Sequence, residues 1–171
     1  MDDEESLTAY HEAGHATIGF ALGGKVEAIQ LGGESEVSGV RQYGDCKIAW
    51  HAVGSDLDVH CQREILTTLA GPAAEMLYAG REIALRSFGP WQQDYHTAWF
   101  LLDRFPISSN EKDKLLKKLL QQLKSILDGD DCWAAVAALA DALLAHEYLE
   151  AEETEEILAY WLVSHRNRRI F

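Results

Sequence analysis

The chain has 171 residues, a length typical of a single domain, and 47% of them are hydrophobic, which supports a buried core and excludes wholesale disorder. The formal net charge of -13 argues against a nucleic-acid partner, because contact with a phosphate backbone requires a basic surface. An acidic N-terminus without a signal-peptide pattern, an apolar run too short to cross a membrane, and three scattered cysteines predict a reduced, cytoplasmic protein with no membrane span.

The first quarter of the chain predicts one helix followed by a small β element. We expect Ser6 to cap the helix at its start and the Gly23-Gly24 pair to end it, because glycine readily adopts the left-handed conformation that stops a helix. Loose alternation over residues 26–31 then predicts a strand, and residues 38–43 could form its return. This stretch is therefore interpreted as a hairpin or small sheet.

Two helices are expected in the middle of the chain. Apolar residues recur at helical spacing over residues 58–79, and Gly80 ends that run. Pro72 lies inside it, so a kink or a junction between two helices is expected there. A loop follows over residues 81–90, and residues 94–104 form the next predicted helix.

Three further helices are predicted towards the C-terminus. Ser109 or Asn110 caps a long helix whose leucines and isoleucines share one face, and residues 133–144 and 152–164 form the last two helices. The expected fold is thus mainly α, a helical domain with a small β hairpin or sheet near the first helix. We predict one domain over residues 1–171, with the candidate site and β element in 1–105 and the closing helices in 106–171.

The first predicted helix contains a metal-binding pattern. His11-Glu12-Ala13-Gly14-His15 fits H-E-x-x-H, in which residues four apart lie on one helix face, so that both imidazoles can reach one zinc ion. Glu12 is the general base of this motif, and the small residues between the histidines let another segment approach closely. The alternative interpretation is two ordinary histidines on a helix surface.

A catalytic zinc ion needs a third protein ligand, and two carboxylates are candidates. Glu75 lies within an apolar helical run, where a buried carboxylate requires a partner. Asp94 follows a Gly-Pro loop near the start of a helix, where an acidic residue is also favoured by the helix dipole alone. These residues leave three possibilities open: Asp94, Glu75 or neither.

Three segments resemble the protease domain of the FtsH-type ATP-dependent zinc metalloproteases. They are residues 9–16 (AYHEAGHA), 69–75 (LAGPAAE) and 89–98, which ends in DYHTA. The resemblance implies a zinc site in which His11 and His15 are ligands, Glu12 is the base and Asp94 is the third ligand. Glu75 then becomes a carboxylate that accepts the remaining N–H of a zinc-bound histidine.

The chain also differs from that family. It has no G-x-x-x-x-G-K-[ST] loop for nucleotide phosphates, and Pro72 stands where the family usually has a basic residue. ATP-driven unfolding is therefore not implied for this chain. A separate ATPase partner and a homo-oligomer are both left open.

These features predict a zinc-dependent peptidase that hydrolyses peptide bonds in accessible or unfolded polypeptides. The strand over residues 26–31 is expected to present an edge that pairs with an extended substrate. One alternative is a non-catalytic, zinc-containing interaction module derived from a protease domain. Another is a zinc hydrolase acting on a non-peptide amide.

Overall fold

A computed structural model describes residues 3–32, 44–51, 56–82 and 91–162. Within these ranges the chain forms six α-helices, one 3-10 turn and three strands. In chain order they are α1 (Asp3–Ala21), β1 (Lys25–Leu31), β2 (Gly44–Ala49), α2 (Leu57–Ala79), α3 (Trp91–Leu101), η1 (Leu102–Arg104), α4 (Ser109–Leu127), α5 (Asp130–His146), β3 (Tyr148–Glu150) and α6 (Ala151–Leu162). The expectation of a mainly helical fold with a small sheet is confirmed.

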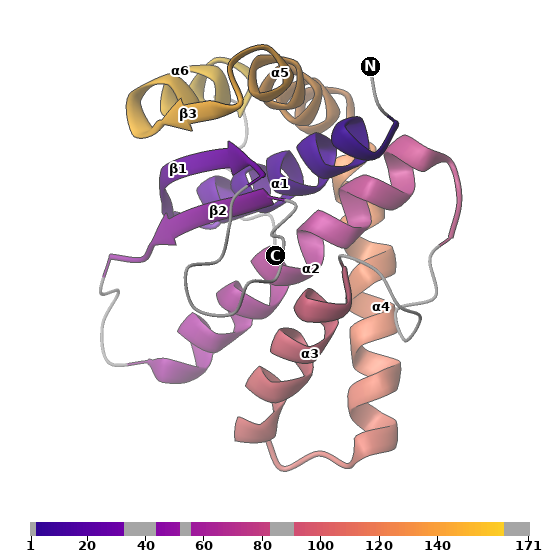
Figure 1. The fold of residues 1–171 in the computed structure, drawn as a ribbon. Helices are drawn as coiled ribbons and strands as arrows, with labels where there is room; N and C mark the ends of the chain where they lie inside the picture. The colour runs from indigo at the N-terminus through magenta and orange to yellow at the C-terminus, as the bar shows by residue number, and fades with distance from the viewer. Residues whose placement is uncertain (1–2, 33–43, 52–55, 83–90, 163–171) are drawn as a thin grey trace.

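Helix α1 lies at the centre of the molecule. It packs against α2 and α5, and both β1 and β2 contact it (Figure 1). Its contact with α2 is very close, since a β-carbon on Gly14 would lie 2.5 Å from the carbonyl oxygen of Ala70 and 2.6 Å from the β-carbon of Ala74. The small residues between the two histidines therefore bring α1 directly against α2, as the sequence suggested.

The sheet is antiparallel, with the strand order β2-β1-β3. The prediction that residues 26–31 form an edge strand is wrong, because β1 is the central strand and β3 pairs with it over Ala28–Gln30. The edge strand on the other side is β2, which begins at Gly44. The predicted returning strand over residues 38–43 lies outside the described residues. Strand β2 begins after that range, and the sequence did not indicate it.

Helix α2 is continuous from end to end. Asp56 caps its start by accepting bonds from the backbone N–H groups of Asp58 and Val59, and Gly80 ends it in the left-handed conformation (φ 62°). Pro72 lies in the helix interior, where it cannot donate to the carbonyl of Thr68. Of the two possibilities expected at Pro72, a kink or a junction between two helices, the junction is wrong because α2 is a single helix.

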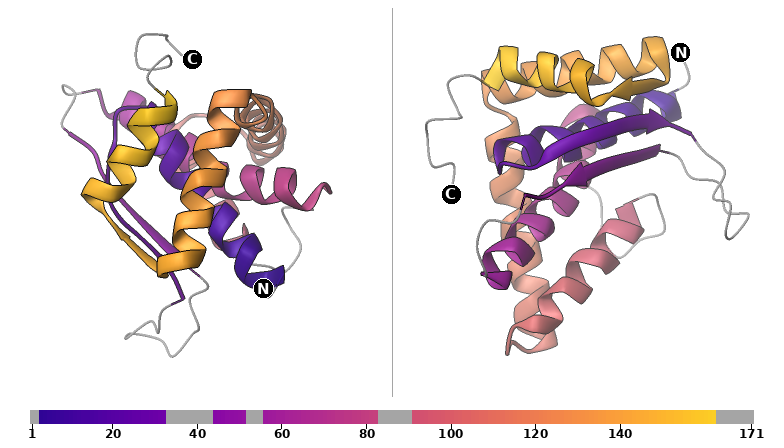
Figure 2. Two further views of the ribbon diagram at one scale, coloured as in Figure 1. Left: turned by 90° about the horizontal axis from the view of Figure 1, so that it is seen from above. Right: turned by 90° about the vertical axis from the view of Figure 1, so that its left-hand side faces the viewer.

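The C-terminal helices complete the core. Helix α4 is amphipathic and buries four leucines, Leu116, Leu120, Leu123 and Leu127; α2 is its main neighbour. Helix α5 packs on α1 and is followed directly by β3 and α6, which return to the sheet (Figure 2). The turn between α5 and β3 passes through Glu147, which has a positive φ of 61°.

Two helix starts differ from the sequence predictions. Helix α1 begins at Asp3, so Ser6 is a buried residue inside the helix and not its cap. The long helix α4 is capped by Ser108, whose hydroxyl accepts from the N–H of Glu111 while the Glu111 carboxylate accepts from the N–H of Ser108. Propensity alone did not identify either start.

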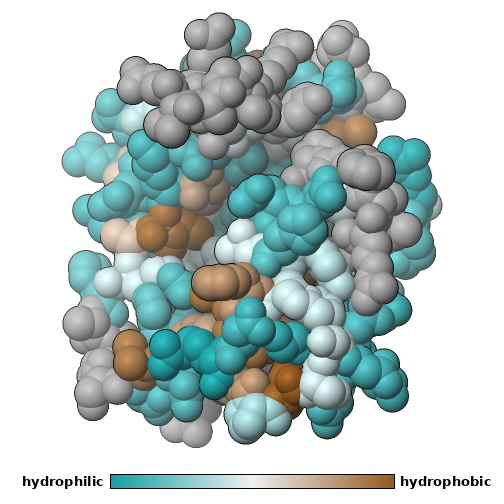
Figure 3. All heavy atoms as spheres, turned by 60° about the horizontal axis from the view of Figure 1, so that its bottom comes forward, coloured by the Kyte–Doolittle hydropathy of each residue, from teal (hydrophilic) through white to brown (hydrophobic). Residues whose placement is uncertain are grey.

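Figure 3 shows one face of the molecule, coloured by hydropathy. On the face seen in Figure 3, the apolar residues drawn in colour form separate patches and not one continuous area. None of the helices in the described ranges combines the length and the apolar character needed to cross a bilayer.

Candidate metal centre

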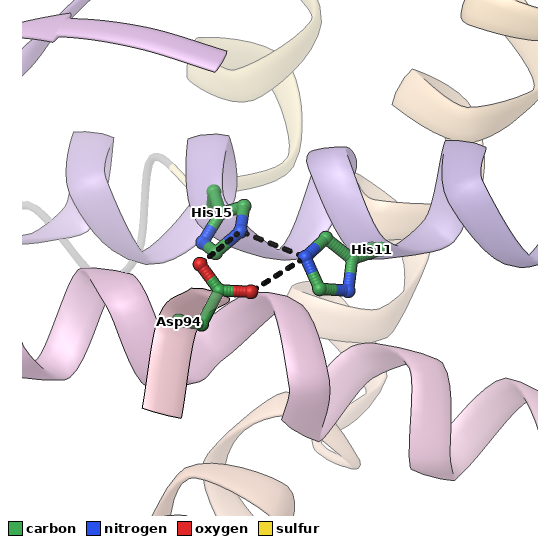
Figure 4. Close-up of side chains that lie close together, drawn as sticks. All are labelled: His11, His15 and Asp94. Atoms are coloured by element: carbon green, nitrogen blue, oxygen red, sulfur yellow. Dashed lines mark hydrogen bonds and ion pairs between the residues drawn. The ribbon is translucent and has the colours of Figure 1, made fainter. Parts of the chain in front are cut away.

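Three side chains converge between α1 and α3. His11 and His15 extend from one side of α1 towards Asp94, which is in the first turn of α3 (Figure 4). The Nε2 atom of His11 lies 2.9 Å from Oδ2 of Asp94 and 3.1 Å from Nε2 of His15, and the Nε2 atom of His15 lies 3.7 Å from Oδ1 of Asp94. These atoms are close enough for all three residues to bind one metal ion.

The other nitrogen of each imidazole has its own partner on α2. Nδ1 of His15 is 2.8 Å from the backbone carbonyl of Thr67, which can only accept, so this nitrogen carries the proton. Nδ1 of His11 lies 3.0 Å from a carboxylate oxygen of Glu75 and donates to it in the same way. Both rings are therefore held with Nε2 directed at the shared point, an arrangement typical of zinc-bound histidines.

This geometry places three acceptors around one point. When both Nδ1 atoms are protonated, the two Nε2 atoms of neutral rings offer lone pairs, and so does the Asp94 carboxylate. Such groups repel one another unless a cation, either a proton or a metal ion, lies among them. Two imidazoles and one carboxylate are a donor set that zinc accepts, so these residues fit a metal ion.

The electrostatics of His11 agree with this picture. Burial disfavours the charged imidazole, but hydrogen bonds to Asp94 and Glu75 outweigh that cost and raise the pKa of His11 to about 10. A proton on Nε2 of His11 would thus be held by the Asp94 carboxylate when no metal ion is bound.

Glu12 lies beside the three converging residues without being one of them. Its side chain is buried and faces β2, where a β-carbon on Gly44 would lie 2.6 Å from Oε1 of Glu12. Burial raises the pKa of Glu12, the nearby His15 and His11 lower it, and Asp94 with Asp45 raises it again, for a net increase. A carboxylate with a raised pKa is a stronger proton acceptor than an ordinary surface glutamate.

The two carboxylate candidates lie in different positions. Asp94 joins the histidines at the shared point, while Glu75 binds the far side of His11. Two other histidines lie elsewhere, since His96 is exposed on α3 and His60 pairs with Glu64 at 3.3 Å. The carbonyl of Thr67 was not predicted, because a backbone acceptor has no signature in the sequence.

Comparisons with known proteins do not identify the chain. No protein-family model matches it, and no curated protein sequence matches it either. Its function is therefore inferred from the site.

Proposed function

We propose that this protein is a zinc-dependent peptidase, with His11, His15 and Asp94 as metal ligands and Glu12 as general base. The observation that carries the proposal is the convergence of both Nε2 atoms and the Asp94 carboxylate at one point, with Glu12 next to it. A structural zinc site is normally closed by four protein ligands, whereas a catalytic site uses three and leaves one position open. A buried carboxylate beside a set of three ligands favours catalysis.

The residues divide the chemistry among them. When bound, zinc would polarise the scissile carbonyl and lower the pKa of a water molecule to about 7. Glu12 accepts a proton from the attacking water and passes it to the leaving amine. Glu75 and the carbonyl of Thr67 hold the imidazoles so that their Nε2 atoms stay directed at the metal position.

The sheet supplies a surface for an extended peptide. In the described part of the chain β2 pairs with β1 alone, so its other side offers unpaired backbone groups. Gly44 begins this strand and lies against Glu12, which would bring a peptide paired with β2 close to the base. Accessible or unfolded polypeptides are the substrates that such pairing suits.

Other parts of the proposal rest on the resemblance to the FtsH-type proteases. A separate ATPase could deliver unfolded substrate, and a homo-oligomer could enclose the site. Cys46, Cys61 and Cys132 are free thiols, which fits a reducing compartment such as the cytoplasm.

The test is Glu12→Gln, which keeps the size of the side chain and removes its basicity. We expect the purified variant to bind zinc as the unaltered protein does and to digest a casein-type unfolded substrate ~10²–10⁴-fold more slowly. Metal analysis accompanies the assay, because two histidines and a carboxylate also suit iron(II).

Two results would count against the proposal. Full digestion by a zinc-loaded Glu12→Gln protein would remove Glu12 from the mechanism. Stoichiometric zinc in the unaltered protein with no hydrolysis of any unfolded polypeptide would favour the non-catalytic interaction module instead.

A further inference from the structure

Gly71 of α2 lies directly against the candidate metal position. A β-carbon added to it would lie 2.4 Å from Nε2 of His15 and 2.8 Å from Nε2 of His11. It would also lie 2.5 Å from Cε1 of His15. A zinc–nitrogen bond is about 2.0–2.1 Å long, so a methyl group here would compete for the space next to both ligand nitrogens.

The residue type at this position is unfavourable for the helix itself. Glycine is a poor helix former because it loses the most backbone freedom on folding. Gly71 is buried in the interior of α2, and the neighbouring small positions Ala70, Ala73 and Ala74 all carry alanine. No positive φ requires glycine at this position. Alanine would gain helix propensity, but its β-carbon would crowd the Cδ atom of the following Pro72, so the backbone alone does not decide between the two residues.

We propose that Gly71 is a positioning residue. Because it has no side chain, the surface of α2 next to the two imidazoles carries no atom that would occupy the metal position. This inference rests on the proposed metal site. The backbone of α2 thus has two functions: Thr67 and Glu75 hold the rings from behind, and Gly71 lets the rings and the ion approach the helix.

The closing experiment compares Gly71→Ala with Gly19→Ala, a change at another buried helix glycine, in α1. For each protein we measure zinc affinity by competition with a chelator, and the melting temperature of the metal-free form. Gly71→Ala should weaken zinc binding by at least ~10–100-fold, the loss typical when a contact that orients a zinc ligand is removed. Its metal-free melting temperature should fall only as far as the displaced imidazoles lose their hydrogen bonds to Thr67 and Glu75.

Gly19→Ala adds the same methyl group to a buried helix glycine without reaching the candidate ligands. Its β-carbon would meet the end of the Ile48 side chain, at 2.4 Å from Cδ1. Zinc affinity should therefore stay within a few fold of that of the unaltered protein, and the metal-free melting temperature gives the effect of a methyl group alone.

Three outcomes decide the matter. Zinc affinity in Gly71→Ala equal to that of the unaltered protein overturns the inference and leaves the metal site intact. Absence of zinc binding in the unaltered protein overturns the proposed function, and the inference with it. If Gly71→Ala does not fold, adding His15→Ala should restore folding by removing the nearest ring, and failure of that rescue also overturns the inference.

Discussion

His11 is the residue on which the candidate site depends most. It is in contact with a carboxylate at each ring nitrogen, Glu75 at Nδ1 and Asp94 at Nε2. Because the imidazole is buried, its charge is stabilised almost entirely by these two neighbours. Proton and metal therefore compete for one nitrogen atom, and this competition can be measured.

The stability of the metal-free protein should depend on pH through His11. Its pKa is about 10 in the folded protein and near the ordinary value of 6.5 in the unfolded chain, so the folded state binds the proton more tightly. The resulting stabilisation is fully present below pH 6.5 and is lost as the pH rises through 10.

Urea unfolding of the metal-free protein and of His11→Gln, at intervals from pH 6 to 10, checks this dependence. Glutamine has no proton to lose in this range, so the difference between the two proteins isolates His11 from other groups that titrate. The difference in unfolding free energy should shrink as the pH rises. A difference that stays constant over the whole range contradicts the expectation.

The two carboxylates should differ in their effect on zinc. Asp94→Ala removes a group at the shared point, whereas Glu75→Ala removes only the partner behind His11. Loss of such a partner typically lowers zinc affinity by ~10–100-fold, and loss of a direct ligand should lower it further. Chelator competition on both variants gives the order, and a larger loss in Glu75→Ala would exchange the two roles.

For single residues, the sequence predicted those positions that depend only on spacing along one helix. The four-residue spacing of His11 and His15 follows from helix geometry, so the pattern alone indicated that they share a face. Asp94 is about 80 residues further along, and the sequence pattern alone did not decide between Asp94 and Glu75 as the third ligand. Gly71 and the carbonyl of Thr67 act through the packing of α1 on α2, which no local pattern encodes.

Among the elements, α3 matters most for the site because it carries Asp94. Two contacts attach it to α4: the Tyr95 hydroxyl is 3.3 Å from Asp113, and the Lys112 ammonium lies 5.4 Å from the Trp99 ring centre. Lys112 also pairs with Asp103 of η1, the turn that directly follows α3. The Trp99 ring therefore lies against the first turn of α4. These contacts fix α3 at the start of α4, the same region that Ser108 caps.

Ser108→Ala tests how much the start of α4 contributes. The substitution removes the hydroxyl that accepts from Glu111 and breaks the reciprocal pair, which should cost about 0.5–2 kcal/mol of unfolding free energy. Zinc affinity of the folded protein should stay unchanged, because the cap touches none of the candidate ligands. Chemical denaturation and a zinc titration on the same sample separate the two effects, and a stability equal to that of the unaltered protein would contradict the capping assignment.

Sequence patterns located the helices well and the strands poorly. Residues 58–79 and 115–127 have strong helical periodicity, and both lie in helices whose ends agree within a few residues. The three residues of β3 are too few for any alternation to be recognised, and they become a strand only by pairing with Ala28–Gln30. The position of β1 in the sheet could not be predicted without that distant pairing.

At the scale of the whole molecule, the two ends of the chain are joined through α1 and β1. Helix α5 packs along α1, and β3 and α6 both contact β1 (Figure 2). The predicted division into 1–105 and 106–171 stays a prediction. All four proposed metal-site and catalytic side chains come from residues 1–105. Elements from residues 106–171 nevertheless pack on α1 and β1, since α5 covers α1 and both β3 and α6 contact β1.

The late position of β3 has a consequence for biosynthesis. A ribosome releases His11, Glu12, His15 and Asp94 long before it reaches Leu149, the residue that pairs with Ile29 of β1. Until then the nascent chain carries its histidines on a helix whose neighbour α5 is incomplete and beside a strand, β1, whose partner β3 does not yet exist. If the protein binds zinc as proposed, metal loading should therefore follow completion of the chain, and the proposed peptidase would become active only then.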